Sequence, residues 1–199
     1  PLAADLRWNF SRDVPQVYLT FDDGPTPGVT NRVLDILKEQ EAKATFFCIG
    51  GNVEKQPALY QRILSEGHGV GNHTWNHMNG RKYGDFAYLK SVLLCSEVVQ
   101  SKLFRPPYGM IRRSQVKALK SRFEVIMWDV LAQDWRHDIT PDKCLDNTVR
   151  HTRNGAIVVM HDSVKAEKNM LYALPRALEM WKEKGLTLAA IPQPQAPMD

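Results

Sequence analysis

The chain has 199 residues, of which 43% are hydrophobic and 24% are charged, and its formal net charge is +4. This size and composition are typical of one globular domain with a full core. Lys and Arg are scattered and form no basic arm, so a nucleic acid partner is not expected. No apolar run approaches the roughly 18 residues that a membrane-spanning helix needs, so no transmembrane segment is expected in this chain.

Short apolar runs alternate with amphipathic stretches along the chain. This alternation is typical of an α/β domain in which helices cover a mostly parallel sheet. About seven strands are expected, in a sheet that curls like a barrel rather than staying open. The predicted elements, in chain order, are a strand at 17–21, a helix at 29–37, a strand at 44–49, a weaker strand near Val70, a long helix at 85–103, a weaker strand near Phe104, a short helix at 114–122, strands at 125–130 and 156–161, a helix at 171–181 and a strand at 186–191.

No linker-like stretch divides the chain. We therefore predict a lead-in at 1–16, one domain at 17–191 and a flexible tail, rich in Pro and Gln, at 192–199. The first residue is Pro1 rather than Met, which indicates a processed or trimmed chain. Whether a signal peptide or an anchor was removed is therefore left open. The chain has three cysteines, Cys48, Cys95 and Cys144. They form no Cys-x-x-Cys pair, which argues against a zinc cluster or a redox motif, but one disulfide between two of them is possible.

Polar side chains gather where the predicted strands end. Asp22 and Asp23 stand side by side after the first strand, and adjacent carboxylates repel each other, more so when buried. Either the pair is a solvated turn, or a cation removes the repulsion. The carboxyl ends of parallel strands meet on one face of the sheet. The polar residues at other strand ends are therefore expected near this pair: His73, His77, Arg105, Asp134 and His161.

His73 and His77 are four residues apart, so one helical turn would place both imidazoles on the same side. Taken alone, such a pair also occurs on solvated helices. Two histidines and one carboxylate are, however, a common ligand set for zinc and related divalent metals. With Asp23 as the third ligand, the repulsion between the carboxylates is resolved, and Asp22 is free to act as a base on water.

Five motifs follow one another in a fixed order: Thr20-Phe21-Asp22-Asp23-Gly24, His73-Thr74-x-x-His77, Arg105-x-Pro107-Tyr108, Asp134-Trp135, and a strand that ends in His161. Together they resemble the NodB-homology polysaccharide deacetylases of carbohydrate esterase family 4. The resemblance runs from about 17 to 191, nearly the whole chain. It implies a deformed (β/α) barrel of the NodB-homology type.

The resemblance also implies which residues hold a metal and move protons. Asp23, His73 and His77 correspond to the ligands of one divalent ion, with zinc favoured and Co²⁺, Ni²⁺ or Mn²⁺ as alternatives. Asp22 corresponds to the general base that takes a proton from the attacking water. His161 corresponds to the general acid that protonates the leaving amine.

Further residues correspond to supporting roles in the family. Arg105 would pair with the base, and Asp134 would hold the imidazole of the general acid in the correct tautomer. The backbone N–H of Tyr108 would stabilise the oxyanion. The residues implied in substrate binding are Tyr108, Pro107 and Trp135. The remaining tryptophans, including Trp128, are read as packing residues.

The implied reaction is removal of N-acetyl groups from a glycan that contains N-acetylglucosamine, such as peptidoglycan or a chitin-like polymer, with release of acetate. The alternatives are an esterase for O-acetyl groups of xylan and a catalytically inactive glycan-binding domain. Glycan substrates of this kind imply an exported protein, and we expect a monomer. The family usually has Asp three residues before the fourth-motif aspartate, where Leu131 stands here, and Leu in place of Val159.

Overall fold

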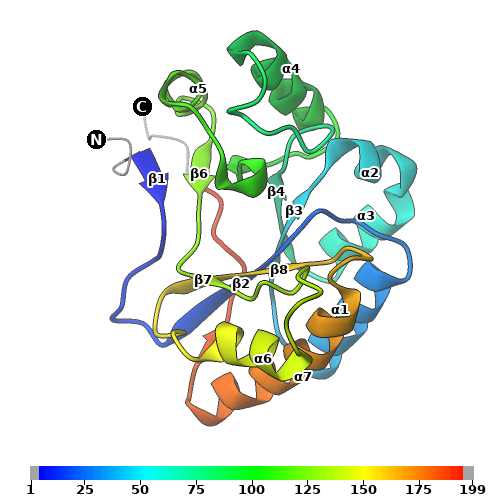
Figure 1. Cartoon of the computed structure of the whole chain (residues 1–199), viewed down its shortest axis with the longest axis vertical. Helices are drawn as coiled ribbons and strands as arrows, with labels where there is room; N and C mark the ends of the chain where they lie inside the picture. Colours follow the sequence, from blue (N-terminus) through cyan, green and yellow to red (C-terminus); the bar gives the residue numbers. More distant parts are fainter. Residues whose placement is uncertain (1–4, 195–199) are drawn as a thin grey trace.

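The computed structural model describes residues 5–194, which form a curled sheet with helices on its outer side (Figure 1). Every pairing between its strands is parallel. β9 (Thr187–Leu188) pairs with the start of β2. The order of the other strands is β1 (Leu6–Arg7), β6 (Glu124–Ile126), β5 (Leu103–Phe104), β4 (Gly69–Asn72), β3 (Thr45–Cys48), β2 (Gln16–Asp22), β8 (Ala156–His161) and β7 (Val130–Leu131).

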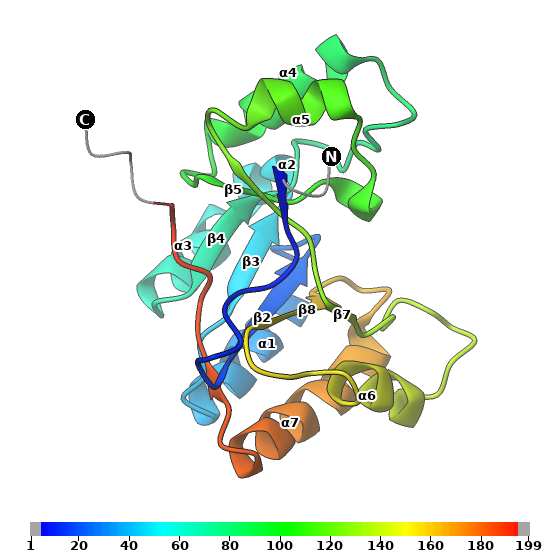
Figure 2. The ribbon, with the colours of Figure 1, turned by 90° about the vertical axis from the view of Figure 1, so that its left-hand side faces the viewer.

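The helices connect successive strands and cover the convex side of the sheet (Figure 2). α7 packs against both α6 and α1, while α4 packs against α5. Irregular segments follow the carboxyl ends of β2, β4 and β8 before the next helix begins. The helices are α1 (Val29–Glu39), α2 (Gly50–Lys55), α3 (Pro57–Ser65), α4 (Asp85–Ser96), α5 (Arg113–Leu119), α6 (Pro141–Val149) and α7 (Glu167–Glu183).

The central strand β2 is buried on both faces, and its alternation decides where its polar residues point. Val17, Leu19 and Phe21 belong to the core cluster beneath the helices. Tyr18 belongs to a second cluster on the opposite, concave side. Since side chains two positions apart share a face, Thr20 and Asp22 also point to the concave side.

One predicted strand is wrong. The apolar run at 125–130 does not form a single strand: β6 ends at Ile126, and β7 begins at Val130 on the other side of the barrel. A buried guanidinium lies where β6 ends. Arg105 donates from Nε to the carbonyl oxygen of Ile126 (3.3 Å) and from Nη2 to that of Met127 (3.1 Å). These two bonds anchor the chain where it leaves β6.

Other boundaries also differ from the predictions. The helix predicted at 85–103 ends at Ser96, because Leu103–Phe104 form β5. The lead-in contains β1, which pairs with β6 at the edge of the sheet. In the predicted tail, Gln193 accepts hydrogen bonds from Ser101 and from the backbone of Lys102, while positions 195–199 lie outside the described residues. The three cysteines are all buried and free, so none pairs in a disulfide.

His68 belongs to none of the five motifs, but its buried ring is expected to make the stability of the fold depend on pH. Its ring is buried, and Nδ1 accepts the backbone N–H of Ala44 (3.3 Å). Burial, with the nearby charge of Lys43, lowers the pKa of His68 from 6.5 to about 4. Between these values the unfolded chain binds a proton that the folded protein does not, so stability falls as pH is lowered through this window.

In thermal melts from pH 7 to 4, His68→Gln should lose less stability with falling pH than wild type. The exposed His151→Gln is the control, and parallel curves for all three proteins would contradict the assignment.

Candidate active site

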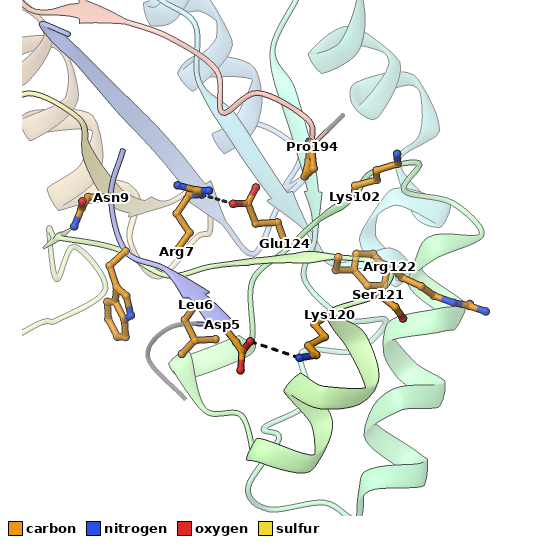
Figure 3. A pocket seen from close by; sticks show the side chains of 12 residues that line it. Asp5, Leu6, Arg7, Asn9, Lys102, Lys120, Ser121, Arg122, Glu124 and Pro194 are labelled. Atoms are coloured by element: carbon orange, nitrogen blue, oxygen red, sulfur yellow. Dashed lines mark hydrogen bonds and ion pairs between the residues drawn. The ribbon is translucent and has the colours of Figure 1, made fainter. Parts of the chain in front are cut away.

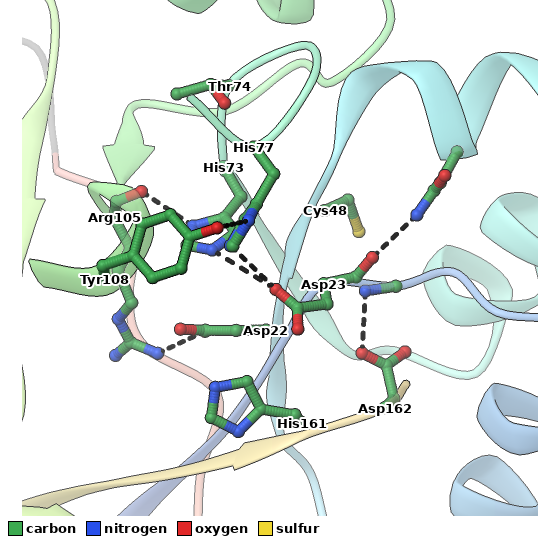
Figure 4. Close-up of polar contacts among 12 residues, drawn as sticks. Asp22, Asp23, Cys48, His73, Thr74, His77, Arg105, Tyr108, His161 and Asp162 are labelled. Atoms are coloured by element: carbon green, nitrogen blue, oxygen red, sulfur yellow. Dashed lines mark hydrogen bonds and ion pairs between the residues drawn. The ribbon is translucent and has the colours of Figure 1, made fainter. Parts of the chain in front are cut away.

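Most of the polar residues at the strand ends line one pocket of about 440 Å³. Figure 4 shows the polar contacts around it. Asp22 ends β2 and lies opposite His161, the last residue of the neighbouring strand β8. Arg105 follows β5, and His73 follows β4. The lining of the pocket consists of Asp22, Asp23, His73, His77, Tyr108, Gly109, Trp128, Leu131, Trp135, Val159, His161, Ser163 and Lys165.

Asp23, His73 and His77 form a group that could hold a metal ion, with one ligand atom from each within 4.8 Å of the others. Oδ1 of Asp23 lies 3.7 Å from Nε2 of His73 and 3.1 Å from Nε2 of His77. The same oxygen is buried yet has no hydrogen bond of acceptable geometry. A buried carboxylate oxygen without a partner, facing two imidazole nitrogens, fits a divalent cation.

The two histidines do not lie on a helical turn, which corrects the sequence prediction. Residues 73–78 form an irregular loop in which Thr74 (φ 65°) and His77 (φ 56°) both adopt the left-handed conformation. The loop is held by side chains: Asn72 Oδ1 accepts the N–H of Thr74 (2.9 Å), and Thr74 Oγ1 accepts the N–H of Met78 (3.0 Å). The spacing of four residues thus brings both rings together through the loop.

The second nitrogen of each ring fixes its orientation. Nδ1 of His73 lies 2.8 Å from the carbonyl oxygen of Arg105, and Nδ1 of His77 lies 3.1 Å from the hydroxyl of Tyr108. Both Nε2 atoms therefore face Asp23, as metal-binding histidines require. Burial lowers the pKa of His73 to about 4, so this ring is neutral near pH 7 and its Nε2 lone pair is available.

Asp22 forms a buried ion pair with Arg105 at the floor of the pocket. Nη1 of Arg105 donates to Asp22 Oδ1 (2.7 Å) and lies 2.6 Å from Thr20 Oγ1. The guanidinium is fully buried and stacks over the ring of Phe47, with 4.1 Å from Cζ to the centroid. This bond fixes the orientation of the Asp22 side chain.

His161 is held by two bonds to the buried carboxylate of Asp134. Its Nδ1 lies 2.8 Å from Asp134 Oδ1, and its backbone N–H donates to Asp134 Oδ2 (2.7 Å). Burial by itself lowers the pKa of His161, but the charge and hydrogen bond of Asp134 outweigh it and raise the pKa to about 9. The imidazolium is thus the stable form near neutral pH.

The walls of the pocket agree with the sequence analysis in part. Tyr108 lines the rim with 61% of its surface exposed, and the ring of Trp135 lies 4.8 Å from that of His161. Pro107 is buried and is not part of the lining. Trp128, read from the sequence as a packing residue, lines the pocket instead. Sequence reasoning also missed two polar residues that follow β8, Ser163 and Lys165, because neither belongs to a motif.

A wider hollow, of about 820 Å³, lies at the edge of the sheet that β1 and β6 form (Figure 3). Its charged residues include the ion pairs of Arg7 with Glu124 and of Lys120 with Asp5. Within residues 5–194, the only group of three or more potential metal ligands is the one formed by Asp23 and the two histidines. The chemistry therefore places the candidate active site in the smaller pocket.

The profile of a protein family described as polysaccharide deacetylase matches residues 11–122, more than half of the chain. The chain belongs to this family. A curated relative, the peptidoglycan-N-acetylglucosamine deacetylase of Bacillus cereus, is 34% identical over 185 residues, which cover 89% of this chain and 67% of the relative. The family and the class of hydrolase expected from the five motifs are thereby confirmed.

Solved structures of the family share the fold. The crystal structure of a peptidoglycan N-acetylglucosamine deacetylase in complex with a substituted N-oxidanyl-benzamide superimposes with a TM-score of 0.89 at 31% identity, covering 94% of this chain and 91% of that one. This match confirms the deformed (β/α) barrel. A pseudoenzyme of the family from Bacillus anthracis also matches, with a TM-score of 0.80, 28% identity and coverage of 92% and 66%. The fold therefore does not by itself decide activity, and the side chains of the site must be considered.

Proposed function

We propose that this polysaccharide deacetylase removes N-acetyl groups from a glycan that contains N-acetylglucosamine, with peptidoglycan as the preferred class, and releases acetate. The observation that carries the proposal is the completeness of the pocket. A candidate metal site faces both a carboxylate paired with Arg105 and an imidazolium paired with Asp134. A domain that only binds glycans would need neither of these proton-transfer groups.

In the proposed reaction Asp22 takes a proton from the attacking water, because it is the carboxylate that the candidate metal ligands leave free. His161 gives its proton to the leaving nitrogen, and Asp134 keeps that imidazole charged and oriented. The N–H of Tyr108, at the rim of the pocket, would donate to the oxyanion. When bound by Asp23 and the two histidines, a divalent metal would supply Lewis-acid catalysis at the acetamide.

Zinc is the metal we propose, because two imidazoles and one carboxylate suit it and leave positions open for substrate. Co²⁺, Ni²⁺ and Mn²⁺ are the alternatives that the same donor set accepts.

The substrate proposal is supported by the named relative from Bacillus cereus and by the exposed rim of the pocket. The apolar side chains of Leu131 and Val159 line the pocket where the family usually has Asp and Leu. This loss of a carboxylate affects substrate preference rather than the reaction.

Within residues 5–194 no helix combines the length and the apolar character needed to cross a membrane. Export of the protein and a monomeric state remain proposals.

The proposed function is tested with metal-depleted protein that is reloaded with zinc. Acetate release should be seen with acetylated peptidoglycan and with chitin oligomers, only after reloading, and should be far slower with monomeric N-acetylglucosamine. Acetylxylan in parallel decides between amide and ester substrates. Faster release from acetylxylan would favour the esterase. No release from any substrate, with zinc bound, would identify an inactive glycan-binding domain.

A further inference from the structure

Asp162 is a fully buried carboxylate to which the proposed reaction gives no role. It follows His161 directly at the end of β8 and is absent from the lining of the pocket. Burying a carboxylate is unfavourable unless it receives hydrogen bonds. The partners of Asp162 therefore indicate what the residue holds in place.

Those partners lie in the loop that follows Asp23 (Figure 4). Oδ1 of Asp162 accepts the backbone N–H of Gly24 (2.9 Å), and Oδ2 accepts the hydroxyl of Thr30 (2.6 Å). The oxygen of Thr30 in turn accepts the backbone N–H of Thr26 (2.7 Å). One carboxylate thus holds both ends of the segment from Gly24 to Thr26, directly and through the hydroxyl.

The close approach of this carboxylate explains the glycine at position 24. A Cβ on Gly24 would lie 1.9 Å from Oδ2 of Asp162, closer than any real contact. Any larger residue at this position would displace the carboxylate. Gly24 and Asp162 therefore fit together as a pair.

The peptide groups around Asp23 are held from a second side as well. Asn52 Nδ2 donates to the carbonyl oxygen of Asp23 (2.8 Å), and the N–H of Ile49 donates to that of Gly24 (3.0 Å). Asp23 itself has φ 84°, a conformation that a residue with a side chain adopts only when its surroundings impose it. This conformation turns its carboxylate toward His73 and His77.

We propose that Asp162, acting with Thr30, is a positioning residue that fixes the backbone after Asp23 and thereby aims the Asp23 carboxylate at the two histidines. The proposal rests on the metal site of the proposed function. Buried polar networks whose members are all hydrogen-bonded impose one geometry, which an apolar side chain of the same size would not do. Groups that orient a metal ligand from outside typically change metal affinity by roughly 10–100-fold when they are removed.

The test measures zinc affinity directly, by competition with a chromophoric chelator, on the whole 199-residue chain, whose fold is checked by circular dichroism and melting temperature without metal. Asp162→Ala removes both acceptors and should weaken zinc binding by roughly 10–100-fold. Asp162→Asn keeps an oxygen for Gly24 and places an amide against Thr30, whose oxygen has two lone pairs, so it should bind zinc nearly as tightly as wild type.

Thr30→Val removes only the hydroxyl and should weaken zinc binding less than Asp162→Ala does. Its matched control is Thr148→Val, at another fully buried threonine, which donates to the carbonyl oxygen of Cys144 within α6. The control should lose stability without any change in zinc affinity.

The outcomes separate this proposal from the one on which it rests. If wild type binds no zinc, the metal site is wrong and the role of Asp162 goes with it. If wild type binds zinc and Asp162→Ala binds it equally well, only the positioning role is overturned. If Asp162→Ala does not fold, Thr30→Val decides: affinity equal to that of Thr148→Val would overturn the proposal. Equal losses in Asp162→Ala and Asp162→Asn would also overturn it, because they would point to charge rather than position.

Discussion

Asp22→Asn is expected to lower kcat on every acetylated substrate by roughly a hundredfold or more, because the amide cannot take a proton from water. The substitution changes the volume of the side chain little and keeps an oxygen for the 2.7 Å contact with Arg105. Zinc affinity should stay close to that of wild type, since Asp22 is not one of the three candidate ligands. Initial rates of acetate release on chitin oligomers and acetylated peptidoglycan measure the effect.

The control for this variant must separate loss of the base from loss of the fold. Removing one charge of a buried pair leaves the other unpaired, which typically destabilises a protein by roughly 3–5 kcal/mol. Rates are therefore compared at a temperature where the variant is folded. Asp129→Asn, which breaks the ion pair with Arg12 away from the pocket, should keep full activity. Activity within a few fold of wild type in Asp22→Asn would mean that another group is the base.

His161→Ala should separate amide from ester substrates. The amine released from an acetamide is a poor leaving group and needs a proton, whereas the phenolate of an activated aryl acetate leaves without one. On an acetylated sugar oligomer, the loss should therefore be on the order of a hundredfold or more, while on an aryl acetate it should be much smaller. Parallel rates on the two substrates test the prediction.

The variant leaves Asp134 buried, but the backbone N–H of residue 161 still donates to its Oδ2, so part of the hydrogen bonding survives. Equal losses on both substrates would show that His161 is not chiefly the acid for the leaving group. A similar loss in zinc affinity would instead show that the substitution disturbs the metal site as a whole.

The sequence could predict the strands that are buried on both faces and the residues that end them. β2 and β8 are largely apolar and buried on both faces, as in a sheet covered on both sides, and each ends in a polar residue of the pocket. Since parallel strands bring their carboxyl ends together, Asp22 and His161 were expected to be neighbours, and the register confirms it. The motifs could identify the family because each of them lies within a few consecutive residues of the sequence.

By itself, then, the sequence determined the class of fold, the family and the residues that carry the proposed chemistry. The tertiary structure decided what depends on contacts between distant residues. Arg105 donates to the carbonyl groups of Ile126 and Met127 where β6 ends, a contact that no local pattern in the sequence indicates. The loop that carries His77 is set by side chains that replace the hydrogen bonds of a helix. Asp162 binds the backbone of Gly24 across 138 positions of the chain, and such a partner becomes visible only when the strands are side by side.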